Sequence, residues 1–406
     1  MAVNLQPLPD LLPVAGIRIG TTAADIRRQN RRDLVVIECA PGTRAAAVFT
    51  QNRFCAAPVL VARDHLALAG PRALVINTGF ANAGTGEPGR QDALAICDEL
   101  ARQLGVDTTE ILPFSTGVIG ERLPVERITS GLAGCIAALD ERGWTEAAAG
   151  IMTTDTQPKA ATVREMIGGV PVTVTGIAKG AGMICPNMAT MLAFIATDAP
   201  VGQAALDALV RSAARVSFNR ITVDGDTSTN DSCVLLATGR AGGETIGQPE
   251  GQAYQALLQM VTRLFTTLAQ AIIRDAEGAT KFITVDVCGG HTEEECLEVA
   301  HTIAHSPLVK TAFFASDPNW GRILAAVGRA RIGQLDVASV TMHINGVCIV
   351  RGGARAPDYS EEQGKVAMSQ QEIALKVDLG LGAASVRVWT SDLSHEYVRI
   401  NAEYRS

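Results

Sequence analysis

Apolar residues recur along the chain with two periods, one of two positions and one near 3.6. Short runs at 34–38 and 73–77 predict buried strands, whereas longer stretches with an apolar residue at every third or fourth position predict helices. The helical stripes lie within residues 93–104, 206–216, 257–272 and 296–303, and Gly105 is suited to end the first of them. This alternation predicts a mixed α/β protein.

The C-terminal third contains closely spaced strand patterns. Residues 339–344 and 347–351 flank Asn345-Gly346, which favours a hairpin because a type I′ turn needs positive φ at both central positions. Alternating runs follow at 373–379 and 385–390. Such spacing fits an all-parallel sheet poorly, and no repeat or proline-rich linker divides the chain. We therefore expect mixed or antiparallel sheets layered with helices rather than two independent modules.

The most informative stretch lies between two predicted strands, 172–177 and 191–196. The loop between them opens with Lys179-Gly-Ala-Gly and ends with Ala189-Thr190, directly before an apolar run. A chain cut at this point makes Thr190 an N-terminal nucleophile, and the released α-amino group, which titrates near ~8, can serve as its base. The cut itself requires the Thr190 hydroxyl to attack the Ala189 carbonyl. The alternative is that Thr190 is an ordinary strand residue.

Other segments supply partners for acyl transfer. The Thr116 hydroxyl and the Gly117 N–H are candidate donors to a developing oxyanion, although a Ser- and Gly-rich segment of this kind can also be a simple turn. The Thr153-Thr154 pair offers further hydroxyls, or alternatively a helix cap. Lys179 can pair with a substrate carboxylate, and Glu277 with a substrate ammonium. The alternatives for these two are a solvated loop lysine and a surface glutamate at a helix end.

Composition narrows the class of ligand. Aromatic residues make up 4% of the chain and the net charge is −7, which gives no support for a nucleic-acid partner. The 224–231 segment resembles a calcium loop but lacks the terminal glutamate, and the histidines have no metal-ligand spacing, so we expect no metal site. The N-terminus has no secretory signal, and no apolar run reaches the ~20 residues of a membrane span. We expect a cytoplasmic protein that acts on small molecules.

Taken together and in order, several segments resemble the ornithine acetyltransferase (glutamate N-acetyltransferase) family. They are residues 77–86, 115–120, 152–155, 179–183, 189–192, 224–231, 277–281, 317–322 and 401–406. The resemblance covers essentially the whole chain. It implies a sandwich of two sheets between helical layers, an αββα fold of the self-cleaving N-terminal-nucleophile type.

The resemblance also implies roles for individual residues. The precursor would cleave itself between Ala189 and Thr190 into an α chain, 1–189, and a β chain, 190–406, which jointly form one active site and commonly assemble as α2β2. Thr190 would carry the acetyl group, with Thr116 and Gly117 as the oxyanion hole. The substrate-binding positions would be Thr153 or Thr154, Lys179, Thr190, Glu277, Asn401 and Ser406.

The implied reaction moves an acetyl group from N²-acetylornithine to glutamate by a ping-pong scheme, in the cyclic arginine pathway. It exchanges one amide for another, so no cofactor is expected, although acetyl-CoA can be a second acetyl donor. One alternative is a self-processing amidase or aminopeptidase that passes the acyl group from the same nucleophile to water. Another is an uncleaved protein that binds an amino acid without turnover.

Overall fold

The computed structural model describes residues 2–185 and 191–403. Within them the strands form three sheets. The first sheet has the order β1-β2-β4-β5, with β4 and β5 parallel and the other neighbours antiparallel. Its strands are β1 (Ile17–Thr22), β2 (Leu34–Cys39), β4 (Ala73–Phe80) and β5 (Ile111–Val118).

The second sheet has the order β3-β10-β8-β7-β6, and only β10 and β8 run parallel. Its strands are β3 (Arg44–Phe49), β6 (Lys159–Ile167), β7 (Val170–Lys179), β8 (Leu192–Thr197) and β10 (Ser232–Ala237). The predicted strands on both sides of the 178–189 loop are therefore neighbours, β7 and β8, paired antiparallel.

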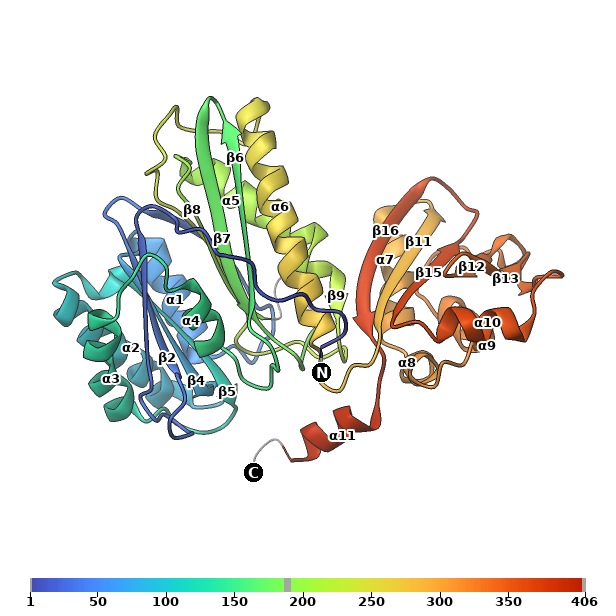
Figure 1. Ribbon diagram of the computed structural model, residues 1–406, viewed down its shortest axis with the longest axis horizontal. Coiled ribbons are helices and arrows are strands. Elements are labelled where there is room, and N and C mark those ends of the chain that lie inside the picture. Colours follow the sequence, from blue (N-terminus) through green and yellow to red (C-terminus); the bar gives the residue numbers. More distant parts are fainter. Residues whose placement is uncertain (1, 186–190, 404–406) are drawn as a thin grey trace.

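These two sheets pack face to face between helices (Figure 1). Phe114 of the first sheet meets Phe194 of the second edge to face, with ring centroids 5.0 Å apart. The outer face of the first sheet packs on α2 (Gly86–Leu104) and α3 (Val125–Ala137), and that of the second on α5 (Gln203–Val216) and α6 (Gly251–Arg274). The αββα layering expected from the resemblance is confirmed. Two shorter helices, α1 (Ala57–Leu68) and α4 (Trp144–Gly150), complete this lobe.

Helix α6 is the one described helix that is long and apolar enough to cross a membrane, by length and composition alone. Its apolar stripe, with Leu257, Leu264 and Ile272 fully buried, packs in the core of the second sheet. Burial in the core accounts for its composition.

The C-terminal part builds a separate lobe (Figure 1), which differs from the expected single set of layers. Its sheet has the order β14-β13-β12-β15-β11-β16-β9 and a core of its own, including Val285, Leu375 and Val388. The strands are β9 (Ile221–Thr222), β11 (Phe282–Gly290), β12 (Thr341–Ile344), β13 (Val347–Arg351), β14 (Ala354–Arg355), β15 (Glu372–Asp378) and β16 (Ala384–Ser391). The helices are α7 (Glu293–Ala304), α8 (Pro307–Phe314), α9 (Trp320–Gly328) and α10 (Glu361–Met368).

The chain then returns to the first lobe through α11 (His395–Ala402). Short 3₁₀ turns lie at Thr108–Glu110, Phe218–Arg220 and Val337–Ser339. Ser394 caps α11 by accepting the N–H of Tyr397 and donates its hydroxyl to the Gly278 carbonyl at 2.6 Å. This contact places α11 beside the segment that follows α6.

Candidate active site

A cavity of about 240 Å³ gathers the predicted site residues that the structure describes. Seven of them line it: Thr116, Gly117, Thr153, Thr154, Lys179, Glu277 and Asn401. They come from two sheets, two loops and the C-terminal helix, so only the folded chain brings them together. Ala189, Thr190 and Ser406 lie outside the described residues.

Thr116 and Gly117 lie at the end of β5, beside the parallel strand β4. Gly117 has φ +137°, and a Cβ at this position would lie 2.2 Å from the Gly79 carbonyl carbon. Only glycine permits this approach of the two backbones. The packing therefore positions the Gly117 peptide at the edge of the cavity.

Lys179 ends β7 and reaches the same edge. Its Nζ donates to Thr116 Oγ1 at 3.1 Å. Burial lowers the pKa of Lys179, while the carboxylates of Asp155 and Asp231 act in the opposite direction. Because the Thr116 oxygen accepts from Lys179, the Thr116 hydroxyl hydrogen remains to be donated elsewhere. This arrangement suits the stabilisation of a negative oxygen in the cavity.

A buried ion network supports this wall. Lys159, fully buried, pairs with Asp155 and Asp275 at 2.7 Å each. Asp155 also accepts the N–H groups of Thr153 at 2.9 Å and Gly180 at 2.8 Å, which ties both lining loops to one carboxylate. Burial alone would raise the pKa of Asp155, but Lys159 and Lys179 hold it below its usual value. The sequence around Lys159 and around Asp275 did not predict their ion pair, because 116 positions of sequence separate them.

Glu277 lies against the glycine loop. Its N–H donates to the Ala181 carbonyl at 2.9 Å, and a Cβ on Gly182 would lie 2.4 Å from its Oε2. Asn401 Nδ2, from α11, donates to the same oxygen at 2.7 Å. Glu277 is 7% exposed, so it is not the surface helix-end residue of the alternative interpretation.

The 224–231 segment contributes to the cavity. Asp224 accepts the N–H groups of Met183 at 2.6 Å and Ile184 at 2.9 Å. Asn230 Nδ2 donates to the Ser115 carbonyl at 2.9 Å, which brings residues 228–230 to the rim, where they line the cavity. The sequence patterns predicted no role for residues 228–230. In the described chain no group of three or more His, Cys, Asp or Glu side chains is placed to hold a metal ion.

The described chain resumes beside this cavity. Met191 is buried, and its carbonyl accepts the N–H of Ser232 at 2.9 Å. Leu192 then pairs with Lys179 on one side and Ser232 on the other. Leu192 thus lies between the strand that carries Lys179 and the strand that follows the rim segment 228–230.

Comparison with known proteins assigns the chain to a family. The ArgJ family profile matches residues 18–406. The chain belongs to the ArgJ family. Two proteins named arginine biosynthesis bifunctional protein ArgJ, from Pseudomonas fluorescens and Pseudomonas syringae pv. tomato, are 56% and 55% identical over 406 residues, with 100% of each chain covered. The chain is therefore an acyltransferase of arginine biosynthesis, which confirms the family and the enzyme class that the resemblance implied.

Solved structures of similar proteins carry related names. The ArgJ protein from Bacillus halodurans is 35% identical, with a TM-score of 0.48 and coverage of 50% of this chain and 95% of that one. An ornithine acetyltransferase from Mycobacterium tuberculosis, solved in complex with ornithine, is also 35% identical. Its TM-score is 0.38, and the match covers 43% of this chain and 93% of that one.

Proposed function

We propose that this ArgJ-family enzyme moves the acetyl group from N²-acetylornithine to glutamate through an acetyl ester on Thr190. The observation that carries the proposal is the cavity of about 240 Å³, which holds a lysine, a glutamate and an oxyanion-type edge within one space. Met191, the covalent neighbour of Thr190, is buried beside the same strands.

The cavity offers a cation to the carboxylate that both substrates share and a carboxylate to the side chain of ornithine. Acetylornithine and glutamate share an α-carboxylate, which Lys179 can bind as a point charge. The side-chain ammonium of ornithine meets Glu277, whose carboxylate is oriented by Asn401 at 2.7 Å. Because one amide replaces another, the exchange is nearly balanced in free energy and needs no activated nucleotide.

The proposed acetyl transfer has two halves, one for each substrate. The Thr190 oxygen attacks the acetyl carbonyl of the donor while its hydroxyl proton passes to the Thr190 α-amino group. The oxyanion that forms accepts from the Thr116 hydroxyl and the Gly117 N–H. The C–N bond then breaks and ornithine leaves as the amine, protonated by the Thr190 α-amino group. Glutamate enters, its amine attacks the ester, and the C–O bond breaks to restore the Thr190 hydroxyl.

The free α-amino group requires a cut between Ala189 and Thr190. The product chains, 1–189 and 190–406, would remain together, because the second sheet takes β3, β6 and β7 from the first and β8 and β10 from the second. We further propose that two such pairs assemble as α2β2 and work in the cytoplasm. Acetyl-CoA is the proposed second acetyl donor, in keeping with the word bifunctional in the names of the two Pseudomonas relatives.

An exchange assay tests the proposal. Purified enzyme with acetylornithine should form acetylglutamate when glutamate is present and little free acetate when it is absent. Free acetate at the same rate with and without glutamate would instead identify the self-processing amidase. The Thr190→Ala variant should lack both activities. Thr108→Ala removes a hydroxyl of the 3₁₀ turn before β5 that donates to Asp98 and does not line the cavity, so it should retain wild-type exchange.

A further inference from the structure

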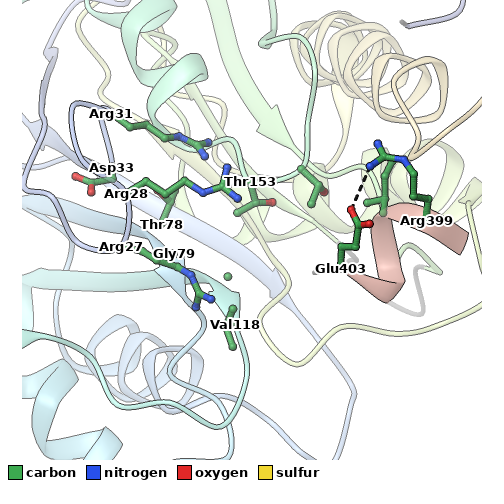
Figure 2. Close-up of a pocket in the computed structure, with 13 residues that line it drawn as sticks. Arg27, Arg28, Arg31, Asp33, Thr78, Gly79, Val118, Thr153, Arg399 and Glu403 are labelled. Carbon is green, nitrogen blue, oxygen red and sulfur yellow. Dashed lines mark hydrogen bonds and ion pairs between the residues drawn. The ribbon is translucent and has the colours of Figure 1, made fainter. Parts of the chain in front are cut away.

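A second cavity, of about 310 Å³, adjoins the acyl-transfer cavity. The two share Gly117, Val118, Thr153 and Thr154 as a common wall. Figure 2 shows the side chains of Arg27, Arg28 and Arg31 extending into this space, with Arg399 and Glu403 of the C-terminal segment across from them. We call it the arginine cavity.

The arginine cavity carries excess positive charge on its N-terminal side. Asp33, the one acidic residue that lines this side of the cavity, accepts the N–H groups of Ala24 at 2.8 Å and Ile26 at 2.6 Å. Arg27 is also paired with Glu121, which lies outside the lining, at 3.9 Å. On the opposite side Arg399 is already paired with Glu396 and Glu403. The cationic cluster is notable in a chain whose net charge is −7.

Two of the guanidinium groups lack an acidic partner at close range. Within residues 2–185 and 191–403, Arg28 forms no hydrogen bond or ion pair. Arg31 donates to the Met152 carbonyl, and burial together with the charge of Arg28 lowers its pKa. Like charges held together in a half-buried space are unfavourable until an anion enters. The cavity is therefore suited to a ligand with several negative charges.

We propose that the arginine cavity binds the phosphate groups of an acyl thioester donor of the coenzyme A type, whose acyl end enters the acyl-transfer cavity past the shared wall. The inference deepens the proposed function and rests on it. An amino-acid substrate occupies the acyl-transfer cavity alone, so a neighbouring space of about 310 Å³ suits a longer molecule. Arginine is the side chain that best matches phosphate, since its planar fork binds two oxygens at once.

The transfer balances without a further reactant. The Thr190 oxygen attacks the thioester carbonyl, the C–S bond breaks, and the hydroxyl proton passes by way of the α-amino group to the thiolate. Glutamate then takes the acetyl group from the ester as in the exchange reaction. Acetylornithine and the thioester donor thus differ only in how the protein binds them, and the thioester donor alone uses the arginine cavity.

Steady-state kinetics on the purified full-length enzyme separates the two donors. Arg28→Gln should raise the KM for acetyl-CoA about ten-fold or more, as expected for one lost charge-assisted contact. The KM for acetylornithine should be unchanged. Arg32→Gln is the matched control, because Arg32 lies on the same loop, carries the same charge and does not line the arginine cavity. Adenosine 3′,5′-bisphosphate should compete with acetyl-CoA and leave acetylornithine kinetics unaffected.

Two results would overturn the inference while the proposed function stands. One is an Arg28→Gln enzyme whose KM for acetyl-CoA equals that of the Arg32→Gln control. The other is a wild type that exchanges acetyl groups between acetylornithine and glutamate but makes no acetylglutamate from acetyl-CoA, whether or not the bisphosphate binds. Absence of exchange in the wild type would instead refute the proposed function itself.

Discussion

Lys179 is the buried charge on which the proposed reaction most depends. Lys179 lies between the carboxylates that offset its burial and Thr116, to which it donates at 3.1 Å. In the proposed mechanism Lys179 orients Thr116, the candidate oxyanion donor, and offers a charge to the substrate α-carboxylate. Both roles act on whichever amino acid occupies the cavity.

Replacement of Lys179 should therefore affect both substrates alike. In Lys179→Met the KM values for acetylornithine and for glutamate should each rise about 10- to 100-fold, since a hydrogen bond to a charged group contributes roughly 1.5–3 kcal/mol. Separate titration of each substrate measures this, with the exposed Lys365→Met as control. Unchanged Michaelis constants in Lys179→Met would refute the carboxylate role.

The Asp155–Lys159–Asp275 network should matter chiefly for stability. Asp155→Asn leaves Lys159 buried with one partner lost, which we expect to cost about 3–5 kcal/mol in urea unfolding. The exposed Asp64, 2.9 Å from Arg90, is the control, and Asp64→Asn should cost less than about 1 kcal/mol. Equal losses in the two variants would contradict a structural role for the network.

The lowered pKa of Asp155 also predicts how the stability of the protein depends on pH. The pKa of Asp155 is lower in the folded protein than in the unfolded chain. Its contribution is therefore complete above the unfolded pKa, about 4, and is lost as the pH falls through the folded value. The stability gap between wild type and Asp155→Asn should shrink below about pH 4. A gap that widens on acidification would show that the sign is wrong.

At the scale of elements, the end of β5 carries the two proposed oxyanion donors, Thr116 and Gly117. Gly117 and Gly120 both have positive φ, +137° and +88°, but only at Gly117 would a Cβ meet backbone atoms. Gly120→Ala should cost about 1–2 kcal/mol from its conformation alone, with normal turnover. Gly117→Ala should also displace β5 from Gly79 and lower kcat, which urea unfolding and exchange assays together will show. Normal turnover in Gly117→Ala would exclude the predicted oxyanion role.

Helix α11 is the element that joins the tail to the site. Its Asn401 holds Glu277, and Tyr397 donates to Asp224 at 3.1 Å, the carboxylate that also fixes the Met183 and Ile184 N–H groups. Deletion of residues 400–406 should reduce exchange and raise acetate release, because water would gain access to the ester. A truncated enzyme with full exchange activity and no added acetate release would reject the role of the tail.

At the scale of the whole molecule, local signals predicted more of the elements than of their assembly. The hairpin at Asn345-Gly346 formed with φ of 45° and 81°, and α2 ended at Gly105 in the left-handed conformation, since each depends on neighbouring residues only. The sequence could not show that β11 would insert between β15 and β16, or that this sheet would form its own lobe. The periodicity of apolar residues predicts that one face of a helix or strand is buried, but it does not show which element packs against that face.

The residues of the candidate site likewise divide into those that could be predicted from the sequence and those that could not. Thr116, Gly117, Lys179, Glu277 and Asn401 could be predicted because they belong to segments that resemble a known family, and the structure brings them into one cavity. The arginine cavity and the Lys159 network could not be predicted. Lys159 meets Asp275 across 116 positions of sequence. Arg27, Arg28 and Arg31 lie close together in the sequence, but nothing in that segment shows that they face Arg399 across a cavity.

The proposed mechanism depends on a break between residues 189 and 190, and intact-mass analysis tests this break most directly. Wild type should give two fragments, 1–189 and 190–406, and Thr190→Ala a single species of 42.6 kDa. After incubation with acetylornithine, the 190–406 fragment alone should gain the mass of one acetyl group. A continuous wild-type chain that still exchanges acetyl groups at full rate, or an acetyl group found on the 1–189 fragment, would contradict the proposed mechanism.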